Sequence, residues 1–128
     1  MAIIGAPFRM PRFESLVWGK AVIDGKTYNY DIVILPDGRI EPRTTPYETL
    51  GSHTFTRDEI ERLINAGAEV IVVGTGTSGM AKLSPEAQRL ASERGVELVV
   101  QTSPLAINTY NWYAAQGRRV AALIHITC

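Results

Sequence analysis

The second half of the chain repeats one unit three times: a capped helix, a glycine, and a strand of apolar residues. In the first unit, Thr56 and Glu59 have the spacing of a capping box, and Gly67 can end the helix in the left-handed conformation before the strand at 70–73. Strands this uniformly apolar need cover on both faces, which crossover helices between parallel strands provide. The repeat therefore predicts a parallel sheet with helices packed against it.

The second and third units begin with a serine at the N-cap and a proline at the first helical position, and each helix ends at a glycine. Their limits are Ser84, Gly95 and a strand at 96–100, then Ser103, Gly117 and a strand at 120–126. Each helix is about one strand length long, since an α-helix of about thirteen residues spans about 20 Å. Each helix therefore returns the chain once, and the strand that follows runs parallel to the one before.

The first third of the chain has the pattern of antiparallel strands. Residues 13–43 contain stretches in which apolar residues alternate with others, and the turn sequences at 24–25 and 36–38 divide them. This pattern predicts a meander of three strands. Residues 44–54 have no apolar period and form a long connection, which is typical of functional or mobile loops.

These segments together predict an α/β fold. We expect a three-layer α/β/α sandwich whose mixed sheet has an N-terminal antiparallel meander followed by three helix–strand units. Residues 1–12, which prolines interrupt, are interpreted as an N-terminal arm, and residues 13–128 as a single α/β domain. At 128 residues the chain is long enough to fold without metals or disulfides.

Charge and cysteine content restrict the function. The 13 basic and 13 acidic residues cancel and form no block of like charge, so we expect no binding to nucleic acid or to an anionic membrane. Cys128 is the only cysteine, and no intrachain disulfide can form, which favours a reducing compartment. The apolar run at the N-terminus is too short for a membrane span or a signal-peptide core. We therefore expect a cytoplasmic protein.

A glycine-rich turn follows the first apolar strand. Residues 74–79 (GTGTSG) fit the pattern G-x-G-x-x-G, which reports dinucleotide binding when a long helix follows directly and an acid ends the next strand. Here the helix restarts only at Ser84, and the nearest candidate for the acid, Glu97, lies at the start of the next strand instead of its end. The sequence therefore predicts no nicotinamide or flavin cofactor.

The same turn is a candidate ligand site of another kind. In open α/β folds, ligands bind at the edge where parallel strands end, and this edge would collect backbone N–H groups and small hydroxyls suited to an anion. The candidate ligand-binding residues are Gly74, Thr75, Gly76, Thr77, Ser78, Thr102 and Ser103. The alternative interpretation is that the glycines only let the backbone turn tightly and pack on the sheet.

Further candidates are found outside the glycine turn. His53, His125 and Cys128 could supply a nucleophile or metal ligands, but His125 and Cys128 have opposite parity along a strand, so no catalytic residue and no metal site is assigned. On the third helix, Tyr110 and Asn111 are candidates, and Trp112 lies about 200° around the helix from Tyr110. We expect one face of this helix to be core. The remaining aromatic residue is interpreted first as a further core residue, and as an interface anchor if it is exposed.

Several of these residues, in this order and spacing, resemble a family of uncharacterised small α/β domains. They are Trp18-Gly19, residues 51–53 (GSH), residues 72–76 (VVGTG), Thr102, Tyr110-Asn111, Gly117 and residues 125–128 (HITC). The family includes the vertebrate adipogenesis-associated protein and mitochondrial complex I assembly factor 3, and the resemblance covers nearly the whole chain. The ending at 125–128 is similar to the first branch, and residues 51–53 are similar to the second.

The resemblance implies a three-layer sandwich without an established cofactor or reaction, whose eukaryotic members act through protein partners. Two functions stay open. One is a non-catalytic binding or assembly-type domain that uses the sheet edge or the third helix. The other is a protein that binds a small anion or metabolite, or an unrecognised enzyme, at residues 74–79. An edge filled by the chain itself, with an exposed apolar patch, favours the first function.

Overall fold

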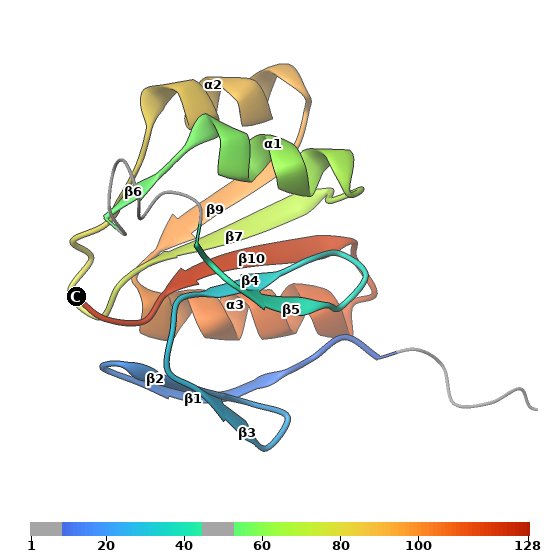
Figure 1. Ribbon diagram of the computed structural model, residues 1–128. Coiled ribbons are helices and arrows are strands. Elements are labelled where there is room, and N and C mark those ends of the chain that lie inside the picture. The colour runs from blue at the N-terminus through green and yellow to red at the C-terminus, as the bar shows by residue number, and fades with distance from the viewer. Residues whose placement is uncertain (1–8, 45–52) are drawn as a thin grey trace, which may run out of the picture.

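A computed structural model describes residues 9–44 and 53–128, which form three layers (Figure 1). The central sheet has the order β5 (Ile40–Pro42), β4 (Ile32–Ile34), β10 (Val120–His125), β7 (Val70–Thr75) and β9 (Glu97–Gln101). Helices α1 (Arg57–Asn65) and α2 (Pro85–Glu93) cover one face of it. The other face carries α3 (Ser103–Ala115) and a small sheet of β1 (Phe13–Val17), β2 (Lys20–Ile23) and β3 (Lys26–Tyr28).

The three helix–strand units are confirmed, and so is the predicted fold class. Strands β10, β7 and β9 pair in parallel, as the crossover helices require. The capping box is formed, because the Thr56 hydroxyl accepts from the Glu59 N–H and the Thr56 N–H donates to the Glu59 carboxylate. The third unit begins one residue earlier than expected, with Thr102 at the N-cap and Ser103 as the first helical residue.

The structure divides the N-terminal strands more finely than the predicted three-stranded meander. Trp18 and Gly19 form an additional turn, with Gly19 at φ +81°, so a hairpin lies where one strand was expected. After β3 the chain crosses to the central sheet, where β4 pairs antiparallel with β10 and β5 extends the edge. Strands β6 (Thr54–Phe55) and β8 (Lys82–Leu83) form a short parallel pair that the sequence did not indicate.

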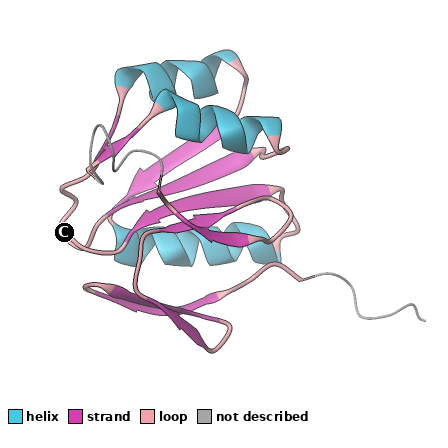
Figure 2. Ribbon diagram, in the orientation of Figure 1, coloured by secondary structure: helices cyan, strands magenta, loops and turns pink. Residues whose placement is uncertain are grey.

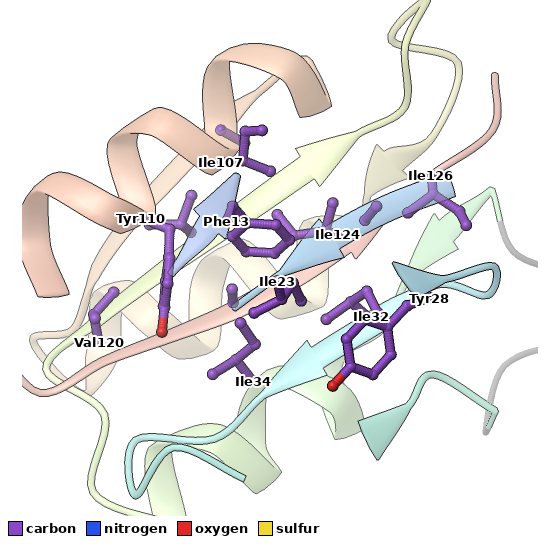
Figure 3. Close-up of a cluster of buried hydrophobic side chains, with 14 of the residues drawn as sticks. Phe13, Ile23, Tyr28, Ile32, Ile34, Ile107, Tyr110, Val120, Ile124 and Ile126 are labelled. Carbon is purple, nitrogen blue, oxygen red and sulfur yellow. The ribbon is translucent and has the colours of Figure 1, made fainter. Parts of the chain in front are cut away.

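Hydrophobic residues fill the space on both sides of the central sheet. Figure 3 shows the cluster between the sheet, α3 and the small sheet, where Phe13 meets Tyr110 edge to face with ring centroids 5.5 Å apart. The Tyr110 hydroxyl donates to the Pro11 carbonyl (2.9 Å), and the Asn111 side chain bonds both backbone groups of Phe13. These bonds fix β1 against α3.

Two predicted features reach beyond the described part of the chain. Residues 1–8 of the predicted arm and residues 45–52 of the long connection lie outside the described residues. The second range includes Gly51 and Ser52, which are part of the resemblance to the family. The boundary between arm and domain stays a prediction. Among the described residues, the helices in Figure 2 are all too short or too polar to cross a membrane.

Candidate functional site

The glycine-rich turn lies where β7 ends, beside the first turn of α3 and the end of β10 (Figure 1). Its centre is the fully buried hydroxyl of Ser103, which donates to the His125 carbonyl (2.5 Å) and accepts from the Gly76 N–H (2.8 Å). A Cβ on Gly74 would lie 2.7 Å from that hydroxyl oxygen. Because no side chain fits there, Gly74 allows the ends of three elements to meet.

N–H groups in and just after the turn donate to the main chain of residues 127–128. Thr77 donates to the main-chain oxygen of Thr127 (2.8 Å), and Ser78 and Met80 donate to that of Cys128 (3.3 and 3.0 Å). A Cβ on Gly76 would lie 2.3 Å from the Cys128 main-chain carbon. The chain itself therefore occupies this edge of the sheet.

The candidate ligand-binding residues thus lie together, as the topology predicted. The Thr75 hydroxyl donates to the Gln101 carbonyl (3.1 Å), and the Thr77 hydroxyl donates to the Thr127 carbonyl (3.1 Å). The Thr102 methyl lies 3.4 Å from the position of a Cβ on Gly79. Whether these residues hold a ligand stays a prediction, and a ligand for the backbone donors would have to displace residues 127–128.

A buried cluster of charged side chains lies beside this edge. Arg43 donates to Asp31 (3.0 Å) and to Glu59 (2.6 Å), and His125 Nδ1 lies 2.7 Å from the same Asp31 oxygen that Arg43 contacts. All four residues are buried, and Arg43 also donates to the Thr54 carbonyl (2.6 Å). The cluster joins the residue before β4 and the residue after β5 to α1 and β10 through charge-assisted hydrogen bonds.

Asp31 is the centre of this cluster. Burial opposes its ionisation, but the hydrogen bonds from His125 and the Ile126 N–H, with the charges of His125 and Arg43, lower its pKa below the ordinary value. Asp31 is therefore held as a carboxylate with every neighbour positioned as a donor. A buried carboxylate of this kind is stable only while its partners remain in place.

His125 lies next to Thr127 and His53. Its Nε2 lies 3.1 Å from the Thr127 hydroxyl, and its ring meets the His53 ring edge to face at 5.1 Å between centroids. Thr127 has the same parity as His125, so its hydroxyl, and not the Cys128 thiol, is the side-chain group found beside the His125 ring. His125 is 1% exposed, so its ring is buried between Asp31, Thr127 and His53.

Sequence reasoning missed four members of this group: Asp31, Arg43, Glu59 and Thr127. The capping-box spacing predicts only a helix-capping role for Glu59. The one signal available was that Asp31 stands directly before a fully buried apolar strand at 32–34, where an unpaired charge would be costly. Among the described residues, no group of three His, Cys, Asp or Glu side chains is placed to hold a metal ion.

Helix α3 separates its aromatic residues as its periodicity predicted. Tyr110 is fully buried, whereas Trp112 is 60% exposed and Leu105, seven residues earlier, is 52% exposed. Leu105, Asn108, Trp112 and Ala115 are exposed on the side opposite Tyr110, and we call them the outer face of α3. This face is a second candidate site, distinct from the glycine-rich turn.

Comparison with known proteins gives a family match and several curated relatives, including one from Bos taurus and one from Mus musculus. A family model described as a protein of unknown function (DUF498/DUF598) matches residues 13–125.

These two curated relatives carry the name NADH dehydrogenase (ubiquinone) 1 alpha subcomplex assembly factor 3. The Bos taurus protein is 25% identical over 103 residues, which are 80% of this chain and 54% of the relative. The Mus musculus protein is 30% identical over 86 residues, 65% and 46% respectively. The chain spans about half the length of these relatives.

Solved structures match over nearly their whole length. The conserved hypothetical protein PH1505 from Pyrococcus horikoshii OT3 is 32% identical with a TM-score of 0.80, and the match covers 91% of this chain and 99% of that one. A protein described as MT938 is 30% identical with a TM-score of 0.78, covering 92% and 99%.

Proposed function

This chain belongs to the DUF498/DUF598 family of proteins of unknown function, and from that membership we propose that it is a non-catalytic binding domain of the assembly-factor type that acts through protein partners. The names of its mammalian relatives support an assembly-type role. Their identity with this chain is modest and their length about twice the matched part, so the partner is proposed here only as a protein. We also propose a cytoplasmic location and residues 13–128 as the single domain.

The outer face of α3 is the observation that carries this proposal. Residues 103–115 contain no charged side chain, although the helix lies at the surface. The centre of a protein interface is depleted in charge and enriched in tryptophan, and Trp112 with Leu105 presents this composition to solvent. An exposed helix face that needed only to be soluble would carry charged residues.

The glycine-rich turn also supports this proposal, because its backbone donors are already used within the chain. Its backbone donors, which an anion would need, bind residues 127–128 of the chain. Small-anion or metabolite binding, with or without catalysis, remains the alternative function, and it requires that a ligand displace this segment. Binding through α3 requires no rearrangement of the fold.

The proposal is tested by capture from the native host with three forms of the immobilised protein. These are the wild type, the double variant Leu105→Ala/Trp112→Ala, and the control Trp18→Ala. Trp18 is 65% exposed on the β1–β2 turn and matches Trp112 in size and exposure. We expect the wild type and the control to retain specific proteins and the double variant to lose them. Truncation of a tryptophan that a partner buries on binding costs at least about 2 kcal/mol of binding free energy.

All three forms should have the same melting temperature, since the changed side chains face solvent. The same retained set for wild type and double variant would contradict a role for the outer face of α3. Loss of the set from Trp18→Ala alone would place the contact on the small sheet instead.

A further inference from the structure

The two edges of the central sheet differ in how they are protected. Strand β5 has three residues, includes Pro42, and carries Glu41, which is paired with Arg62 (2.7 Å). Short length, proline and charge are devices that stop an edge strand from pairing with another chain. Strand β9 has five residues, ELVVQ, with no proline and a register with β7 that runs without a bulge.

The outer side of β9 has no pairing strand within residues 9–44 and 53–128. The Glu97 N–H donates to the Glu69 carbonyl (3.0 Å), so the backbone groups of Glu97 point toward β7. Backbone direction alternates along a strand, and therefore the N–H and C=O groups of Leu98 and Val100 point away from the sheet. Val100 is 42% exposed, so this edge is accessible.

We propose that β9 pairs antiparallel with β9 of a second copy of this chain, with Val99 on the two-fold axis. In this register Leu98 lies opposite Val100 of the partner, and both have outward-pointing backbone groups, so each such pair can exchange two hydrogen bonds. Val99 lies opposite itself, and Glu97 lies opposite Gln101. All five residues of the strand are then paired.

The strand is complementary to itself in this register, and that is why the occupant is a second copy. Leu98 and Val100 form apolar cross-strand pairs on the α1–α2 face, where Leu98 already packs against the core. Glu97 meets an uncharged glutamine, so no like charges oppose each other. The contact is isologous, which closes the assembly at a dimer. The outer face of α3 remains free, because it points away from the sheet.

Symmetric disulfide cross-linking tests the register. In a Cys128→Ser background, Val99→Cys places two thiols across a pair without hydrogen bonds, whose Cα atoms lie about 4.5 Å apart and within disulfide range. The matched control is Val100→Cys, whose two copies are diagonal neighbours about 7–8 Å apart, beyond that range. Under mild oxidation, we expect Val99→Cys to form a covalent dimer at least about tenfold faster than the control.

Sedimentation equilibrium measures the molecular mass in solution. We expect the wild type to be a dimer and the Val100→Lys variant to be a monomer. The exposed control Val17→Lys, on β1, should remain dimeric. Equal cross-linking rates of the two cysteine variants, or a wild type that is monomeric at all concentrations, would overturn the β9 pairing. Either result leaves capture through α3 unaffected, so the two proposals fail separately.

Discussion

Gly76 meets two structural requirements at once. Its φ is +105°, where residues other than glycine are strained, and the main chain of Cys128 lies where a Cβ would be. Gly79, three residues later, has a similar φ of +71°, but the nearest atom to its Cβ position is 3.4 Å away. The comparison of these two glycines separates backbone strain from the close approach of residues 127–128.

We predict that Gly76→Val destabilises the protein more than Gly79→Val, by an additional 1–3 kcal/mol or so, because only the first also displaces the Cys128 main chain. Urea unfolding of both variants measures this difference. The melting temperature of the wild type, measured with and without phosphate, tests the alternative that the turn binds a small anion. Equal destabilisation of the two variants, together with a wild type that phosphate stabilises, would favour a ligand site at the turn.

Asp31 gives a prediction about pH. Its pKa is lowered in the folded protein, so its contribution to stability is fully present above the unfolded pKa and is lost as pH falls through the folded pKa. We expect NMR titration of the Asp31 carboxyl to give a midpoint below its ordinary value. We also expect the free energy of unfolding to decrease as pH falls below about 4.

Asp31→Asn is the matched variant for this prediction, since it keeps the shape and removes the charge. It should be less stable at neutral pH and should lose less stability on acidification than the wild type. An Asp31 midpoint at or above the ordinary value would mean that desolvation outweighs the bonds from His125 and Ile126.

At the scale of elements, the helix caps differ in a way that can be measured. The Ser84 hydroxyl accepts from the Ala87 N–H (3.1 Å), whereas Thr102 makes no side-chain cap bond. We predict that Ser84→Ala costs about 1 kcal/mol in the free energy of unfolding and that Thr102→Ala costs less. Similar losses for the two variants would show that packing, and not capping, determines how much these two side chains contribute to the free energy of unfolding.

Elements with local signals were predictable from the sequence. The capping pair Thr56 and Glu59, the proline after Ser84 and the glycine at 95 each specify a helix end through neighbouring residues only. The strands that follow were recognisable because they are continuous apolar runs. Parallel pairing then followed from the length of the helices.

The division of the N-terminal strands and the buried cluster were not predictable in the same way. Strand β4 pairs with β10, almost ninety residues later in the chain, and no local pattern encodes that choice. The cluster of Asp31, Arg43, Glu59 and His125 brings together four separate elements. Each residue alone has an ordinary local role, so only the tertiary fold reveals the group.

At the scale of the whole molecule, the chain uses its own residues 127–128 to fill the edge where open α/β folds bind ligands. Among the described residues, the outer face of α3 and the outer side of β9 are the surfaces that we propose as contacts. They lie on different sides of the molecule, one on a helical layer and one at the sheet edge. If both proposals hold, the domain binds a second copy of itself through β9 and a protein partner through α3 at the same time.

Photo-cross-linking in the native host is the most direct test of the claim that the outer face of α3, and not the glycine-rich turn, is the working surface. A photoreactive residue replaces Trp112 in one variant and Met80, which directly follows the turn and is 58% exposed, in another. We expect specific protein adducts from position 112 and none from position 80. Adducts from position 80 with none from position 112 would contradict this claim.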